Sequence, residues 1–330
     1  MRKIKIGQIG IGHNHAEAKM LSVRKFPDLF EVVGYAETNE DWIKTRGGNV
    51  GYQGLIKYEV DELINKCDAI LVETDVWDLT KIAQKCVLAG KHIHMDKPAS
   101  ENLEEFRAML DIAESKNLVV QLGYMYRYNP AIQKSINLVK SGDLGEIYSI
   151  NAEMSTCHSA QYRKWLTNFK GGIMYILGCH LIDIIVYLLG EPKTISAFLK
   201  KTNQDGIEVE DNNFVILEYD KTIARIYVSS VEVNGFGRRQ FVISGSEGTI
   251  DIKPIESPCV FNYSDKKNID NIYTDNKVTE ILKDDLAYGR YDNMMKDFYE
   301  YVVGNKENPY TYEHEYKVQK VLMQIVNDKK

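Results

Sequence analysis

The 330-residue sequence lacks a surplus of positive charge, a long unbroken apolar run and any C-x-x-C cysteine pair. Its formal net charge of -6 gives no overall positive field, so we expect neither a nucleic-acid nor a membrane partner. The five cysteines are scattered and odd in number, which argues against a disulfide framework and favours a cytoplasmic protein. The longest apolar-rich stretch, residues 173–189, contains Gly178, His180 and Asp183, and is therefore expected to be a buried helix and not a membrane span.

The first third of the chain alternates short apolar runs with helical patterns. This repetition is typical of a parallel sheet covered by helices on both faces, so we predict an α/β Rossmann-type doubly wound sheet. The predicted strands are 4–9, 31–36, 69–74, 91–95 and 118–122, and the predicted helices are 14–25, one ending near 89, and 101–115.

After about residue 123 the pattern changes to consecutive strands joined by short turns. We expect a C-terminal α+β domain with a mostly antiparallel open sheet, and hence domains at 1–122 and 123–330. The polar segment 262–280 is predicted to be a loop or lid. The predicted helices are 130–140, 171–189, 285–303 and 312–327, and the predicted strands are 145–154, 193–200, 212–219, 222–230, 238–244 and 248–252.

The stretch GQIGIGHNHAEAKM, residues 7 to 20, has two of the three glycines of the dinucleotide-binding pattern G-x-G-x-x-G. It follows a predicted strand and opens a predicted helix, which is the context that the motif requires. Gly10 can make the tight turn, and Gly12 lets the backbone approach a pyrophosphate at the helix N-terminus. The third position is His15, but that glycine serves helix–strand packing, so its loss is the least damaging of the three.

An acidic residue at the end of the second strand completes the motif. Glu37 stands there, and its carboxylate can accept from both ribose hydroxyls but would repel a 2′-phosphate. This favours NAD over NADP, although Lys44 and Arg46 lie close enough in sequence to leave NADP open. We expect Gly10, Ile11, Gly12, His13, Asn14 and Glu37 to bind the cofactor. The alternative is a glycine turn without a ligand.

Residues 89–98 read AGKHIHMDKP, so that a predicted strand ends in Asp96-Lys97-Pro98. The carboxyl edge of an open α/β sheet is where ligands bind, and a lysine before proline favours an extended backbone. Lys97 is therefore a candidate for a functional lysine. The alternative is a surface lysine at a strand end.

The helix predicted at 171–189 is apolar almost all round, yet it contains His180 and Asp183. Such groups are costly to bury unless they are paired. Their i, i+3 spacing puts them on one face, so Asp183 can orient His180 and fix its tautomer. The alternative is a core histidine with its hydrogen bonds satisfied.

Taken together, these motifs resemble the glucose-fructose oxidoreductase/inositol dehydrogenase (Gfo/Idh/MocA) family. The resemblance runs nearly end to end, through the glycine loop, DAILVET at 68–74, AGKHIHMDKP, GYMYRYNP at 123–130 and GGIMYILGCHLID at 171–183. It implies an N-terminal Rossmann domain, a C-terminal domain whose open sheet forms a dimer or tetramer interface, and an active site between the domains. Family members are mostly NAD(P)-dependent oxidoreductases of sugars, inositols or related polyols.

The resemblance also assigns roles to particular residues. Lys97, His180 and Asp183 would be catalytic, and Thr74, Asp96 and Lys97 would lie at the cofactor. The substrate would be bordered by Tyr126, Arg127, Arg163, Trp165 and His180.

The chain departs from the family pattern at three positions. Ile176 stands where the family has an aspartate one turn before the histidine, Leu79 replaces a histidine, and Asp75 replaces a proline. The loss at Ile176 indicates either an altered site or a decayed one. Removing one acid–base group typically costs about 10²–10⁴-fold in rate, so an altered site can still turn over.

The leading hypothesis is an NAD-dependent dehydrogenase or reductase acting on the CH–OH group of a sugar or polyol. One alternative is an enzyme that retains NAD and uses transient oxidation for elimination or glycoside cleavage. Another is a non-catalytic dinucleotide-binding sensor. We expect no metal, because Cys157-His158, Cys179-His180 and His92-x-His94 match no zinc template.

Overall fold

A computed structural model describes residues 2–283 and 289–328 of the chain. The chain forms two compact units, one of Met1–Met125 with Ala287–Gln319 and the other of Tyr126–Leu286 with Lys320–Lys330. The sequence analysis assigned residues 289–319 to the second domain, whereas in the structure they pack within the first unit. The functional division at 122/123 stays a prediction.

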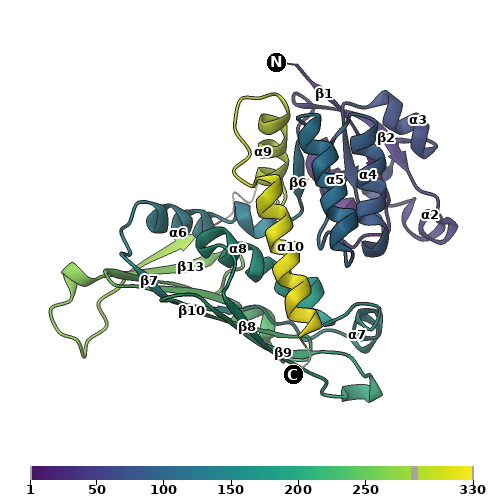
Figure 1. The fold of residues 1–330 in the computed structure, drawn as a ribbon. Helices are drawn as coiled ribbons and strands as arrows, with labels where there is room; N and C mark the ends of the chain where they lie inside the picture. The colour runs from purple at the N-terminus through teal and green to yellow at the C-terminus, as the bar shows by residue number, and fades with distance from the viewer. Residues whose placement is uncertain (1, 284–288, 329–330) are drawn as a thin grey trace. The chain divides into compact units, whose positions relative to one another are not determined.

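Among its described residues, the first unit contains a six-stranded parallel sheet with the order β3-β2-β1-β4-β5-β6 (Figure 1). The central strand β4 reads AILV and is buried throughout, as expected for a parallel sheet covered on both faces. The predicted doubly wound fold is confirmed. The strands are β1 (Ile4–Ile9), β2 (Phe30–Ala36), β3 (Ile56–Lys57), β4 (Ala69–Val72), β5 (His92–Met95) and β6 (Val120–Leu122).

The helices of this unit follow from its topology. The chain moves in opposite directions along the sheet from β1 to β2 and from β4 to β5, so right-handed crossovers place α1 and α4 on opposite faces. Helix α4 packs with α5, and α1 packs with α9. The helices are α1 (Ala16–Arg24), α2 (Glu40–Arg46), α3 (Val60–Lys66), α4 (Leu79–Leu88), α5 (Leu103–Ser115), α9 (Asp292–Val302) and the start of α10 (Tyr312–Asn327).

The sequence analysis missed α2, α3 and β3. Helix α2 reads EDWIKTR and contains no buried residue, so no apolar periodicity marks it. Its start is fixed locally, because the Asn39 side chain accepts from the N–H groups of Asp41 and Trp42. The predicted helix 285–303 corresponds to α9, and its positions 285–288 lie outside the described residues.

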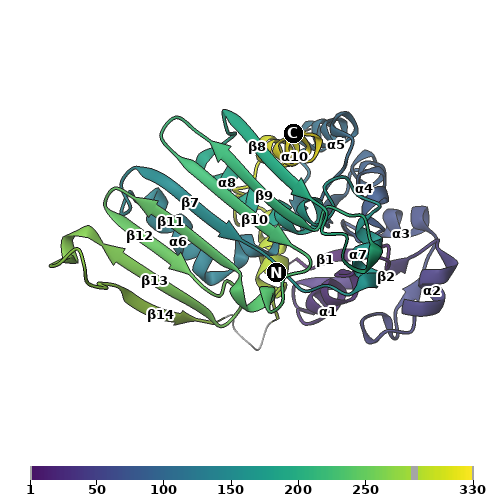
Figure 2. The ribbon, with the colours of Figure 1, turned by 90° about the horizontal axis from the view of Figure 1, so that it is seen from below.

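In the described part of the second unit, eight strands form one sheet in the order β14-β13-β12-β11-β7-β10-β9-β8 (Figure 2). All neighbours are antiparallel except β7 and β10, so the predicted mostly antiparallel sheet is confirmed. Helices α6 (Pro130–Lys140) and α8 (Cys179–Leu189) pack on one face. The strands are β7 (Ile147–Glu153), β8 (Thr194–Lys200), β9 (Asn212–Glu218), β10 (Ile223–Ser229), β11 (Gln240–Gly245), β12 (Gly248–Ile252), β13 (Cys259–Asp265) and β14 (Val278–Leu282).

The loop predicted at 262–280 is confirmed at 266–277, where the chain forms no strand, and is wrong at its two ends. A lid role for it stays a prediction. Strand β13 runs on to Asp265 and pairs with β14, which begins at Val278. Strand β14 ends the sheet, and edge strands commonly carry polar side chains, whereas β13 lies between β12 and β14. Within the described ranges, no helix is long and apolar enough to cross a membrane.

Candidate functional site

The glycine loop connects β1 to α1 at the carboxyl edge of the sheet. Gly10 has φ +90, and a Cβ there would lie 2.4 Å from the backbone nitrogen of Thr74, so only glycine fits. In the described part of the chain, no protein group accepts a hydrogen bond from the N–H of Gly12 or Asn14. These two donors can bind phosphate oxygens at the start of α1.

Glu37 is attached to this loop. One carboxylate oxygen accepts from the N–H of Ile11 at 2.8 Å, and the other accepts from Thr38 and Asn39 at 2.8 Å each. A carboxylate has about four lone-pair sites, so the position retains acceptor capacity for a ribose hydroxyl. A pocket of about 240 Å³ lies beside it. Its lining includes Gly10, Glu37, Thr74, Asp75, Asp78 and Lys81.

The backbone angle and the ring direction of His15 explain why the third position of the motif does not need a glycine. Its φ is -98, which any residue adopts, and its ring points away from the sheet contact toward Asp96. The distance from Nδ1 of His15 to Oδ2 of Asp96 is 3.1 Å. The loop therefore keeps its shape without the glycine.

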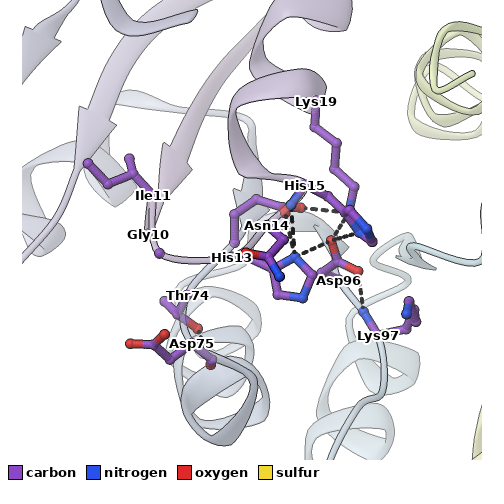
Figure 3. A network of polar contacts seen from close by, with 12 residues as sticks. Gly10, Ile11, His13, Asn14, His15, Lys19, Thr74, Asp75, Asp96 and Lys97 are labelled. Carbon is purple, nitrogen blue, oxygen red and sulfur yellow. Dashed lines mark hydrogen bonds and ion pairs between the residues drawn. The ribbon is translucent and has the colours of Figure 1, made fainter. Parts of the chain in front are cut away.

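Behind the loop lies what we call the buried polar cluster, made of His13, His15, Lys19, Glu73, His94 and Asp96; His15 is partly exposed and the other five side chains are buried. Figure 3 labels His13, His15, Lys19 and Asp96. The Lys19 ammonium lies 2.6 Å from Oδ2 of Asp96 and 2.9 Å from Oε1 of Glu73. His13 Nδ1 lies 2.9 Å from the same Asp96 oxygen. The sequence analysis named His13 and Asp96 only as cofactor contacts and missed Lys19 and Glu73. A lysine in the first helix, one turn after a histidine, gave no periodic signal.

Burial and pairing shift the pKa values of the buried polar cluster. Burial lowers the pKa of His15 to about 4 and lowers the pKa of His13, although Asp96 opposes both shifts. Burial raises the pKa of Glu73 well above its usual range. Burial also acts to raise the pKa of Asp96, but His13, Lys19 and His15 outweigh it and hold that pKa well below its usual range. The surroundings therefore favour the charged form of Asp96 more strongly than that of Glu73.

The ligand atoms of His13, His15 and Asp96 lie within 4.8 Å of one another, a spacing that a metal ion can use. The Lys19 ammonium, however, already lies against the shared Asp96 oxygen. Burial acts to lower the pKa of Lys19, but Asp96 and Glu73 outweigh it and raise that pKa, so the ammonium is charged. The positive charge at this position is therefore supplied by the protein.

Lys97 follows the cluster directly. Its side chain is buried, and its backbone N–H donates to Oδ1 of Asp96 at 2.7 Å. The Lys97–Pro98 peptide bond is cis. The same carboxylate thus binds Lys19 through one oxygen and fixes the strand end that carries Lys97 through the other.

In the second unit, the helix predicted at 171–189 is a π-helical turn, Met174–Gly178, followed by α8. π-Helical turns are frequent at functional sites. The turn contains Ile176, which is buried, and α8 places His180 with its ring 4.9 Å from that of Tyr126, edge to face. The predicted helix is therefore present, and the aliphatic Ile176 lies in the π-helical turn that precedes α8.

Asp183 has a partner that the sequence analysis did not name. The structure gives its carboxylate a two-point contact with Arg127, and the orientation of His180 by Asp183 stays a prediction. The Arg127 Nε and Nη2 donate at 2.9 Å and 2.6 Å, and both side chains are buried. The pair links Arg127, which directly follows Tyr126, to α8. Asp183 therefore helps to position this part of the chain.

A second polar group, missed from the sequence, surrounds Tyr126. Its hydroxyl donates to Glu256, and Arg239 donates to that hydroxyl at 2.9 Å and to Glu256 at 2.6 Å. Arg239 also donates to Oγ1 of Thr156 at 2.5 Å. The residues come from separate strands and loops, which is why no local motif marks them.

Two other expected substrate residues lie on α7 (Ala160–Leu166). Arg163 is 1% exposed, forms an ion pair with Asp205 and donates to the carbonyl of Gln204 at 3.1 Å. Trp165 packs between the rings of Tyr162 and Phe169. Substrate contact by Arg163 and Trp165 stays a prediction.

Comparison with models of known protein families identifies the class of protein to which the chain belongs. An oxidoreductase-family model with an NAD-binding Rossmann fold matches residues 4–124, and a GFO/IDH/MocA C-terminal domain model matches residues 132–251. The two matches cover most of the chain in the order expected for an oxidoreductase. The chain belongs to the Gfo/Idh/MocA family.

Individual relatives agree with this assignment. Glucose-6-phosphate 3-dehydrogenase of Bacillus subtilis is 31% identical over 229 residues, which span 66% of this chain and 63% of the relative. The NADP-dependent scyllo-inositol 2-dehydrogenase of the same organism is 24% identical over 180 residues, 53% of this chain and 50% of the relative. The structure of levoglucosan dehydrogenase with NADH and levoglucosan has a TM-score of 0.84 at 19% identity, covering 98% of this chain and 96% of that one. At this low sequence identity, the similarity to levoglucosan dehydrogenase shows only that the two proteins share a fold.

Proposed function

We propose that this protein is an NAD-preferring dehydrogenase or reductase acting on a ring hydroxyl, or the matching carbonyl, of a sugar, inositol or related polyol. The observation that carries the proposal is the placement of Glu37 beside a glycine loop with two available N–H donors. The relatives named above, which act on sugars and an inositol, support the substrate class.

The residues of the first unit suit a dinucleotide. The N–H groups of Gly12 and Asn14 would hold its phosphates, and Glu37 would accept from the adenosine ribose. The Glu37 carboxylate would repel a 2′-phosphate, which supports NAD over NADP. When bound, the nicotinamide supplies the hydride acceptor or donor.

Proton transfer is assigned to this chain's own side chains. Lys97 at the end of β5, or His180 on α8, takes the proton of the substrate hydroxyl in oxidation and returns it in reduction. Asp96 acts on Lys97 through its backbone, and Arg127 with Asp183 holds the segment that carries Tyr126. Ile176 supplies no acid, so two groups share the work that three share in the family pattern.

The test is a titration of cofactor-free protein with NADH and with NADPH, followed by a panel of sugars and polyols. We expect NADH to bind at least about tenfold more tightly, or about 1.4 kcal/mol. In Glu37→Gln, which keeps one acceptor but removes the charge, the preference for NADH should fall severalfold.

The outcomes separate the competing hypotheses. Binding of neither cofactor would contradict the proposal. Cofactor retained through purification, with bond cleavage but no net NADH, would indicate transient oxidation. Tight binding without turnover on the whole panel would indicate a sensor.

We also propose that a second copy of the chain covers the sheet face opposite α6 and α8. Phe198, Ile223 and Ile281 are exposed there, and Phe198 lies 6.5 Å from the Phe214 ring of the neighbouring strand. Light scattering should give a dimer or tetramer, and Phe198→Asp with Ile223→Lys should shift it toward monomer. A monomeric wild type would contradict this part. A cytoplasmic location stays a prediction from the cysteine pattern.

A further inference from the structure

The indole of Trp42 lies directly against the glycine loop. A Cβ on Gly12 would meet Trp42 Nε1 at 2.5 Å and Cδ1 at 2.8 Å. The second glycine of the motif is the one that lets a pyrophosphate approach the backbone. In this structure the space beside Gly12 is filled by a side chain of the protein itself.

Two polar contacts hold the indole in this position, in addition to its packing against the buried cluster of Ile11, Met20, Tyr35 and Tyr52. Its N–H donates to Oδ2 of Asp75 at 2.9 Å, and the guanidinium carbon of Arg46 lies 4.3 Å from its ring centre. Asp75 follows β4, and Trp42 lies on α2 beyond β2, so the indole bridges the two sides of the loop. Asp75 stands where the family pattern has proline, which makes this acceptor a feature of this chain.

Arg46 also binds the loop itself. Its Nη1 donates to the carbonyl of Gly12 at 2.7 Å and to that of His13 at 3.0 Å. The guanidinium therefore stays at the loop whether or not the indole covers it. A positive charge beside the phosphate-binding N–H groups favours an anionic ligand there once the indole has moved.

We propose that Trp42 is a gate on the dinucleotide site, closed by its bond to Asp75 and opened when the cofactor pyrophosphate displaces the indole from Gly12. This inference rests on the proposed function. A site that binds ligand only when open has an apparent affinity lowered by the closed fraction. The gate thus weakens cofactor binding, because the cofactor binds only after the Trp42 side chain has moved away from Gly12.

The first experiment measures NADH binding by calorimetry in Trp42→Ala and Trp42→Phe. Without the gate, Trp42→Ala should bind NADH about tenfold more tightly than wild type. Trp42→Phe keeps a ring over Gly12 but loses the N–H, so its gain should be smaller, about threefold. Trp77→Phe is the control, because Trp77 is 58% exposed and should leave the affinity unchanged.

Whether Trp42→Ala binds NADH more tightly or more weakly than wild type tests the gate. Weaker binding in Trp42→Ala would mean that the indole contacts the bound cofactor, which would overturn the gate and leave the proposed function intact. Binding in neither wild type nor Trp42→Ala would overturn the proposed function itself. Binding only in Trp42→Ala would support both.

A matched pair at Asp75 tests the bond without altering the indole. Asp75→Asn removes the charge but keeps an oxygen acceptor, whereas Asp75→Ala removes both. The gate predicts about threefold tighter NADH binding in Asp75→Ala than in Asp75→Asn. Equal affinities would assign any gain to the lost charge and would overturn the role of the bond.

Fluorescence reports the movement directly. In Trp77→Phe/Trp165→Phe, Trp42 is the remaining tryptophan of the three in the sequence. Titration with ADP-ribose, which carries the pyrophosphate but no nicotinamide, should shift its emission to the red and increase its quenching by acrylamide. Saturable ADP-ribose binding by calorimetry with no spectral change would overturn the gate.

Discussion

The ammonium of Lys19 lies 2.6 Å from Oδ2 of Asp96, and neither side chain is exposed to solvent. The pair joins the first turn of α1 to the end of β5, directly behind the glycine loop (Figure 3). A buried charge without its partner costs several kcal/mol, so this pair holds the loop and the Lys97 strand end in one arrangement.

The two carboxyl groups beside Lys19 should respond differently to neutralisation. Burial raises the pKa of Glu73 well above its usual range and so disfavours its charge, and we expect Glu73→Gln to change the free energy of unfolding by less than about 1 kcal/mol. Asp96 carries the charge that Lys19 needs, so Asp96→Asn should cost about 3 kcal/mol. Urea unfolding at pH 7 measures both.

The double variant is the control for this assignment. In Asp96→Asn alone, Glu73 can ionise and partly replace the lost charge. Asp96→Asn/Glu73→Gln should therefore be less stable than the sum of the single variants. Strict additivity, or a larger cost for Glu73→Gln than for Asp96→Asn, would contradict the opposite directions of the two pKa shifts.

His15 should make the free energy of unfolding pH-dependent. Its pKa is about 4 in the folded protein and about 6.5 when unfolded, so the unfolded chain binds the extra proton first as the pH falls. The contribution of His15 to stability is thus complete above about pH 6.5 and is lost as the pH falls toward 4.

The comparison variant is His15→Asn, which keeps a residue suited to the start of a helix but does not titrate. The difference in unfolding free energy between wild type and variant should decrease between pH 7 and pH 4.5, by on the order of 1–3 kcal/mol. Parallel stability curves over this range would show that His15 titrates normally in the folded state.

Replacement of Lys97 should separate catalysis from binding. Lys97→Met keeps the length and burial of the side chain but cannot transfer a proton. With a substrate found on the polyol panel, kcat should fall about 10²–10⁴-fold while the Kd for NADH changes little. Full turnover in Lys97→Met would remove it from the catalytic groups, and a matching loss of NADH affinity would indicate a binding role.

We expect the buried contact between Arg127 and Asp183 to contribute mainly to the free energy of unfolding. Asp183→Asn leaves a buried guanidinium without its counter-charge and should cost about 3–5 kcal/mol in unfolding free energy. Arg127→Met/Asp183→Leu removes both charges and should recover a large part of this loss. A double variant no more stable than Asp183→Asn would mean that the two side chains act independently.

Sequence patterns predicted the architecture well where burial is periodic. The strands β1, β2, β4, β5 and β6 were found because a parallel sheet buries both faces and leaves short apolar runs. Helix α2 was missed because it buries no residue, and β14 was missed because edge strands commonly carry polar side chains. Strand β13 lies inside the sheet but ends in the polar run NYSD at 262–265, which hid it from the pattern. These elements form through a cap and through pairing with a neighbouring strand, which a local pattern does not record.

The sequence by itself determined the glycine loop, Glu37 and the lysine at the strand end, because each depends on local backbone geometry at the end of a strand. Only the tertiary structure decided the partners of the side chains. It paired Asp183 with Arg127 and placed Lys19 against Asp96. It also placed Trp42 against Gly12, where the indole N–H donates to Asp75. The physical reason is that buried charges and ring faces are satisfied by whatever the fold brings within about 3–4 Å, and those neighbours lie far apart along the chain.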